Sequence, residues 1–134
     1  MSRGEIHHIE RAQQINSFKN MKYGKITPTD MDGMIEYKNK AYIFLEVKYK
    51  DKTLPFGQKL ALERLVKDTS INKYSIAIVC EHYIDDTRKQ IDVADCNVRE
   101  LYLSGENKWR PPAIAMTVRE LINLFIENIV EKNF

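Results

Sequence analysis

The chain has 134 residues, of which 43% are hydrophobic and 30% charged, and its formal net charge is +2. A chain of this length can bury enough surface to fold as one unit, so we expect a single domain over residues 1–134. The charge balance is too mild to indicate nucleic-acid binding by itself, so any such surface depends on where the basic residues gather. No run of about 18 apolar residues occurs, so we expect no membrane-spanning helix.

The start of the chain and its cysteines bear on the cellular compartment. The first residues, MSRGEIHHIERAQ, lack the apolar core of a secretion signal. Cys80 and Cys96 lie in different expected elements, and nothing requires them to pair. We therefore expect a cytoplasmic protein, located in the host cytoplasm if a phage encodes it.

The N-terminal segment predicts a helix followed by a loop. Residues 23–29 (YGKITPT) contain Gly24 and Pro28, which indicates a loop. Residues 4–20 before them have apolar side chains at steps of three, which is typical of an amphipathic helix. These side chains are Ile6, Ile9, Ala12, Ile15 and Phe18.

Two strands, residues 33–38 and 41–48, are predicted to form a hairpin around Asn39 and Lys40. Side chains alternate between the two faces of a strand, so the second strand has one uniformly apolar face, which should meet the core. That face carries Ala41, Ile43, Leu45 and Val47, and the opposite face carries Tyr42, Phe44, Glu46 and Lys48.

The register of this hairpin depends on the length of its loop. A strict two-residue loop pairs positions whose numbers sum to 79 and puts Asp32 on the face opposite Glu46. An odd loop, such as three residues with a bulge, places Asp32 across from Glu46. We favour the odd loop because it satisfies the hydrophobic pattern, whereas a one-residue slip would bury the charged face. It aligns Ile35 and Tyr37 with Ile43, Leu45 and Val47.

The remaining elements complete an α/β arrangement. Residues 57–68 predict a helix with Leu62, Leu65 and Val66 buried, and the apolar run 74–81 predicts a central strand. Residues 91–103 predict a further strand or two, and residues 109–112 (WRPP) predict a loop. The expected fold class is α/β, with a mixed central sheet flanked by helices.

The last predicted helix starts at a capping box, Thr117 to Glu120, and runs to about Lys132. Its apolar stripe is wide, so it could bury itself in the core or form a homodimer contact, and the core is the better interpretation. The stripe consists of Val118, Leu121, Ile122, Phe125 and Ile129, widened by Leu124, Ile126 and Val130.

The chemistry-bearing residues lie around the hairpin. Mg²⁺ in proteins usually takes one or two carboxylates plus waters and phosphate oxygens. Asp32 and Glu46 could supply two carboxylates, and the backbone carbonyl of Val47 a third oxygen. Lys48 shares the face of Glu46, where an ammonium group could orient an attacking water and offset phosphate charge.

This layout resembles the PD-(D/E)xK nuclease superfamily over roughly residues 1–80. Asp32 matches the motif aspartate, and Glu46, Val47 and Lys48 match the (D/E)xK element. Gln58 matches the glutamine that opens the following helix in several branches. The proline that usually precedes the aspartate is absent from that position, which holds Met31.

The resemblance implies a restriction-endonuclease-like αβββαβ core, dependence on Mg²⁺ or Mn²⁺, and hydrolysis of phosphodiester bonds. Within it the short chain is similar to phage-encoded or resolvase-like members. A first-helix carboxylate assists the metal in resolvase-like branches, which makes Glu10 the candidate and Glu5 the second choice. Asp30 is the main rival to Asp32. Gln58 is expected to help hold Lys48 or a phosphate.

Basic residues cluster unevenly, and Lys22, Lys25 and Lys50 are the candidates for nucleic-acid contact. Such lysines would make binding sensitive to salt. For each lysine alone, an ordinary solvated surface is the better interpretation.

The sequence thus predicts a Mg²⁺-dependent endonuclease acting on DNA, with branched or structured DNA as the first candidate substrate. A nicking or single-strand nuclease is the next alternative, followed by action on RNA or a small cyclic nucleotide. Its size suggests a homodimer or a protein partner that delivers the substrate. The alternative from another class is a non-catalytic nucleic-acid-binding or inhibitor protein on the same fold.

Overall fold

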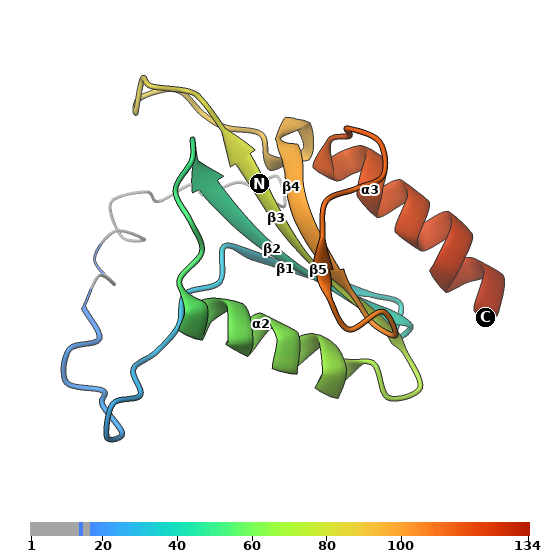
Figure 1. The fold of residues 1–134 in the computed structure, drawn as a ribbon, viewed down its shortest axis with the longest axis horizontal. Coiled ribbons are helices and arrows are strands. Elements are labelled where there is room, and N and C mark those ends of the chain that lie inside the picture. The colour runs from blue at the N-terminus through green and yellow to red at the C-terminus, as the bar shows by residue number, and fades with distance from the viewer. Residues whose placement is uncertain (1–13, 15–16) are drawn as a thin grey trace.

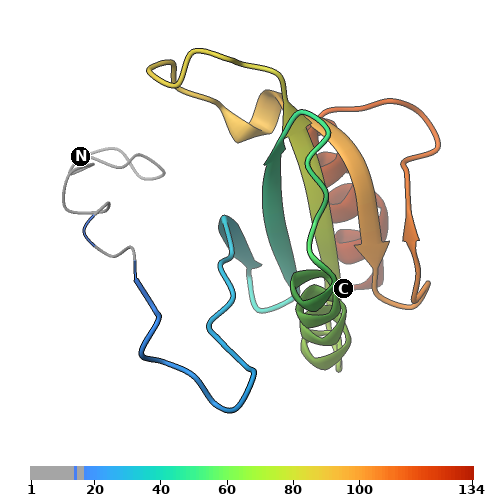
Figure 2. The ribbon, with the colours of Figure 1, turned by 60° about the vertical axis from the view of Figure 1, so that its left-hand side comes forward.

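The computed structural model describes residue 14 and residues 17–134. Within this part of the chain, a five-stranded mixed sheet in the order β1-β2-β3-β4-β5 lies between two helices, α2 on one face and α3 on the other (Figures 1 and 2). The predicted α/β class is therefore confirmed. The bounds are β1 Gly33–Tyr37, β2 Ala41–Tyr49, α2 Phe56–Thr69, β3 Tyr74–His82, β4 Asn97–Leu103, β5 Trp109–Arg110 and α3 Val118–Phe125.

The β1–β2 hairpin has the odd loop that the hydrophobic pattern favours. Its pairs run from Gly33↔Leu45 to Tyr37↔Ala41, which leaves residues 38–40 as a three-residue loop. Lys38 and Asn39 turn the chain with positive φ values of 49° and 60°. One step beyond the first pair, the same register puts Asp32 across from Glu46.

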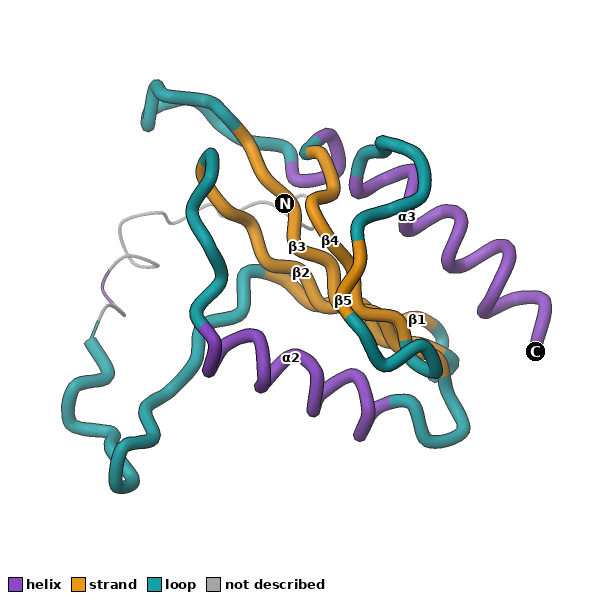
Figure 3. Tube along the Cα trace, in the orientation of Figure 1, coloured by secondary structure: helices purple, strands orange, loops and turns teal. Residues whose placement is uncertain are grey.

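β2 is a central strand, and both of its faces are covered. After β2 the chain crosses over through α2 and returns as β3, which is parallel to β2 (Figure 3). A helical crossover of this kind covers one face of the sheet. The face of β2 that carries the charged residues is therefore largely covered by α2 instead of facing solvent, and Phe44 on it is buried. It packs with Leu62, Val66, Ala77 and Tyr102.

The opposite face of the sheet holds the larger core, covered by α3. The predicted capping box is present, since the Glu120 N–H donates to Thr117 Oγ1 and the Thr117 N–H donates to Glu120 Oε1. The helix continues as a π-helical turn, Ile126–Val130, and a 3-10 turn, Glu131–Asn133. Its apolar stripe packs on the sheet, as the core interpretation predicts, while Leu124 stays exposed. The buried members are Val118, Leu121, Phe125 and Val130.

Three sequence-based expectations need correction. The helix predicted over residues 4–20 does not extend to its expected end, because residues 17–20 are not helical; most of the remainder lies outside the described residues. Residues 17–32 are exposed, so no core contact stabilises a helix there, and an unsupported short helix is marginal in water.

The second correction concerns Trp109 and Arg110, which form the edge strand β5 instead of a loop. The Trp109 ring packs on Tyr102, 5.3 Å between centroids, and its Nε1–H donates to Glu63 Oε1 at 2.7 Å. Leu65, expected in the buried stripe of α2, is exposed. These differences arise from tertiary contacts that local patterns do not encode.

Cys80 and Cys96 are both buried and unpaired with each other, as the sequence suggests. Burial raises the pKa of the Cys80 thiol to about 12, which keeps it protonated. None of the helices in residues 17–134 combines the length and apolar character needed to cross a membrane.

Candidate active site

Asp32 directly precedes β1, one residue beyond the end of the β1–β2 ladder, and lies beside Glu46. Its Oδ2 accepts a hydrogen bond from the Val47 backbone N–H at 2.7 Å. In an antiparallel ladder this N–H would go to a carbonyl of the neighbouring strand, so the carboxylate takes the place of the next backbone acceptor. The N–H and C=O of one strand residue point to the same side, so the Val47 carbonyl is directed toward the same edge.

Glu46 is the least expected feature of this region, because its charged side chain is only 4% exposed. Its Oε2 is buried and has no hydrogen-bond partner among the described residues. Burial, and then the nearby Asp32 carboxylate, raise its pKa to about 7, against the opposing effects of Lys48 and Gln58. A buried polar atom without a partner is costly, so such a position calls for a specific reason.

Lys48 lies on the same face of β2 as Glu46. Its Nζ is 3.8 Å from Glu46 Oε1, and its side chain is 18% exposed. The ammonium group is therefore close enough to attract the carboxylate, yet it retains access to solvent. This places a cation beside the Glu46 carboxylate, while the catalytic role expected for Lys48 stays a prediction.

Gln58, in the first turn of α2, joins two parts of the site. Its Nε2 donates to the backbone carbonyl of Asp30 at 3.0 Å, and its amide also lowers the pKa of Glu46. This amide therefore holds the loop before β1 against α2. The expected support of Lys48 or a phosphate by Gln58 stays a prediction. Asp30, the rival to Asp32, contributes its carbonyl here, whereas Asp32 is the residue that faces Glu46.

The donor set suits a hard divalent cation. Two carboxylates, Asp32 and Glu46, and a backbone carbonyl, that of Val47, are oxygen donors of the type that Mg²⁺ and Mn²⁺ accept. The unpartnered Oε2 of Glu46 is where a cation would restore a missing interaction. Within residues 17–134 no cluster of three or more Asp, Glu, His or Cys side chains forms a metal site. The predicted first-helix ligands, Glu10 and Glu5, lie outside the described residues.

The lysines proposed for nucleic-acid contact fall in different surroundings. Lys25 lines a groove beside α2, and Lys22 is exposed in the same loop. Lys50 follows β2, where its Nζ is 2.9 Å from Asp85 Oδ1 and lies over the Tyr49 ring. Lys50 is thus engaged in a surface ion pair, which weakens the case for it as a free phosphate contact.

Arg99 is a residue of this region that the sequence analysis missed. Its guanidinium donates to Glu81 Oε1 at 3.2 Å and to the carbonyls of Lys52 and Lys50 at 2.6 and 2.5 Å. It therefore fixes the segment that leads from Lys48 toward α2. A register shift opposite Val79 and Cys80 brings Arg99 to this face, and an irregularity of that kind leaves no clear pattern in the sequence.

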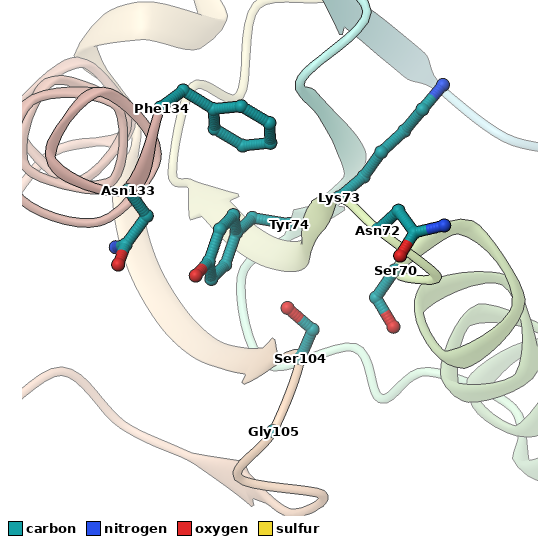
Figure 4. Close-up of a pocket in the computed structure, with 8 residues that line it drawn as sticks. All are labelled: Ser70, Asn72, Lys73, Tyr74, Ser104, Gly105, Asn133 and Phe134. Atoms are coloured by element: carbon teal, nitrogen blue, oxygen red, sulfur yellow. The ribbon is translucent and has the colours of Figure 1, made fainter.

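A separate hollow lies at the far end of the sheet (Figure 4). Tyr74, which lines it, pairs with Ala41 at the start of β2, and Glu46 is five residues further, about 17 Å along the strand. The hollow has a volume of about 600 Å³ and is not part of the site around Glu46. It is lined by Ser70, Asn72, Lys73, Tyr74, Ser104, Gly105, Asn133 and Phe134.

Comparison with known proteins assigns no family to the chain. No model of a protein family matches it. No curated protein and no solved structure matches it either.

Proposed function

We propose that the protein is a Mg²⁺- or Mn²⁺-dependent nuclease that hydrolyses phosphodiester bonds in DNA. The observation that carries this proposal is the buried Glu46, whose Oε2 has no partner among the described residues while the Asp32 carboxylate lies beside it. A second carboxylate close to the buried Glu46 raises the cost of ionising it, and a divalent cation offsets that cost.

Each residue then has a distinct role. Asp32 and Glu46 would bind the cation through their carboxylates, and the Val47 carbonyl would add a neutral oxygen. When bound, such a cation lowers the pKa of a water molecule and offsets charge on the phosphate. Lys48 would orient the attacking water and stabilise negative charge on the phosphoryl oxygens. Gln58 would keep the loop before β1 in position.

The arrangement of the elements also supports the proposal. A hairpin carries Asp32 and the Glu46-Val47-Lys48 element, a helix beginning near Gln58 follows, and a parallel strand comes next. This order resembles the PD-(D/E)xK nucleases. One difference is that residues 17–55 hold two strands before α2, β1 and β2, where the resemblance implies three.

The first test measures metal binding. Calorimetric titration with Mn²⁺ should show specific binding to the native protein and strongly reduced binding to Asp32→Asn and Glu46→Gln. Asp68→Asn is the matched control, because it removes an exposed carboxylate from α2, away from the site. Equal Mn²⁺ binding by all four proteins would show that Asp32 and Glu46 are not metal ligands.

The second test measures cleavage of labelled duplex, single-stranded, nicked and four-way-junction DNA with Mg²⁺ or Mn²⁺. The native protein and Asp68→Asn should cut at least one substrate, and Asp32→Asn should cut none. Specific metal binding without cleavage of DNA or RNA would contradict the nuclease. DNA binding with neither metal binding nor cleavage would instead support the non-catalytic alternative on the same fold.

A further inference from the structure

A groove runs beside the site, between the loop before β1 and the first turns of α2. Its volume is about 620 Å³. Gln58 lines the groove. The same side chain donates a hydrogen bond to the Asp30 carbonyl and lowers the pKa of Glu46. Gln58 therefore connects the groove to Glu46, one of the proposed catalytic residues. Its lining residues are Lys25, Ile26, Thr27, Pro28, Thr29, Asp30, Pro55, Gly57, Gln58, Leu60, Ala61 and Arg64.

The charges of the groove favour an anion. Lys25 and Arg64 lie on its two walls, and Asp30 is the one acidic residue among the described residues that line it. Arg64 is exposed, so its guanidinium is available to a ligand. Cations spaced along a groove are typical of surfaces that follow a phosphate backbone.

Two exposed aromatic side chains lie next to residues that line the groove. Phe56 is 81% exposed and lies between two lining residues, Pro55 and Gly57. Tyr23 is 73% exposed and is held in a tight turn by reciprocal backbone hydrogen bonds with Ile26, a lining residue, at 2.9 and 3.1 Å. Exposed aromatic rings beside cations are what unpaired bases stack on.

The size of the groove limits the form of the nucleic acid. Its volume falls in the range of pockets for small ligands, roughly 300–1,000 Å³, so it admits a few unpaired nucleotides and not both strands of a duplex. A paired base also hides its face within the stack, which would leave Phe56 and Tyr23 without a partner.

We propose that this groove binds a single strand of DNA, with phosphates on Lys25 and Arg64 and a base on Phe56, and directs that strand to Asp32 and Glu46. The inference rests on the proposed nuclease function and specifies its substrate as unpaired DNA. The binding itself involves only the groove residues, so it can be measured in the absence of metal.

The test uses fluorescence anisotropy of a labelled oligothymidine and of a duplex of equal length, with EDTA present, over a series of salt concentrations. The full-length protein should bind the single strand at least about ten-fold more tightly than the duplex. Removing two phosphate contacts in Lys25→Ala/Arg64→Ala should reduce the slope of log K against log salt by about 1.4, at about 0.7 per contact. The control Lys67→Ala/Lys108→Ala removes two exposed cations outside the groove and should leave the slope unchanged.

Substitutions at Phe56 separate stacking from general apolar contact. Phe56→Leu should weaken single-strand binding by roughly ten-fold, whereas Phe56→Trp should retain it, because only an aromatic ring can stack on a base. Ile71→Ala, which alters an apolar residue that is 72% exposed elsewhere, should have no effect. Equal binding of duplex and single strand, or an unchanged salt slope in the groove variant, would overturn the inference.

The two proposals fail in different ways. If the native protein cuts DNA while the Lys25 and Arg64 variant binds and cuts single strands normally, the groove inference is wrong and the nuclease stands. If single strands bind in the groove but no nucleic acid is cut with any divalent cation, the nuclease is wrong and the groove inference stands.

Discussion

The two faces of β2 differ in the chemical character of their buried side chains. Toward α3, the strand presents Ala41 and Ile43, both fully buried in a continuous apolar core. Toward α2, the buried Phe44 is followed by Glu46, equally inaccessible but charged and with an unpartnered oxygen. One face of the strand stabilises the fold, whereas the other retains a costly polar group. Such a cost is expected at a functional site and has no evident structural benefit here.

The largest effect should come from the α2 face. Glu46→Ala should reduce cleavage by about 1,000-fold or more, which corresponds to about 4 kcal/mol in the barrier. Without metal, the free energy of unfolding should be unchanged or slightly higher, because the variant removes a buried charge next to Asp32. Cleavage rates and urea denaturation in EDTA measure both effects. Normal cleavage by this variant would exclude Glu46 from the mechanism.

The α3 face should respond in the opposite way. Ile43→Ala deletes a fully buried side chain and should lower the free energy of unfolding by about 3 kcal/mol. Mn²⁺ affinity of the folded variant should stay close to native, since Ile43 points away from the carboxylates. Denaturation curves and Mn²⁺ titration at low temperature test this pair of outcomes. A loss of metal affinity larger than the loss of stability would show that the two faces are not independent.

On the α2 face, a substitution at Lys48 should separate the rate of cleavage from the affinity for metal. Lys48→Ala should slow cleavage by about 100-fold, which is the lower end of the range for general acid–base groups. Mn²⁺ binding should persist, because the variant removes a neighbouring positive charge and no ligand. Single-turnover cleavage rates and Mn²⁺ titration of Lys48→Ala measure the two effects, and Lys67→Ala is the control. Loss of metal binding would assign Lys48 a structural role instead.

The local features of the fold could be predicted because they follow short-range rules. The register of the hairpin follows from the alternation of apolar residues, and the start of α3 from Thr117 and Glu120. The pairing of Asp32 with Glu46 then follows from the register alone. These predictions needed no knowledge of what covers the sheet.

The rest depends on contacts between distant segments. The Asp32 bond to the Val47 amide joins residues 15 positions apart, and the Gln58 bond to Asp30 joins residues 28 apart. Arg99 reaches the carbonyls of Lys50 and Lys52 from the point where β4 is irregular, opposite Val79 and Cys80. No local periodicity contains this information, so the sequence could predict which residues come together at the candidate site but not the bonds that position them.

The smallest effect concerns the pH dependence of stability in the absence of metal. The pKa of Glu46 is raised to about 7 in the folded protein, from 4.5, chiefly by burial. The folded state therefore binds more protons than the unfolded state between these two values, and stability falls as pH rises through that window. We expect a decrease on the order of 2 kcal/mol from Glu46, measured by urea denaturation between about pH 5 and 8.

Glu46→Gln should remove this pH dependence of stability, and Asp68→Asn should retain it. Saturating Mn²⁺ should also reverse the trend in the native protein, because a bound cation favours the ionised carboxylate. A native protein whose stability in EDTA is constant over this range would show that Glu46 is already ionised at low cost, and the difference between the two faces of β2 would then be one of packing alone.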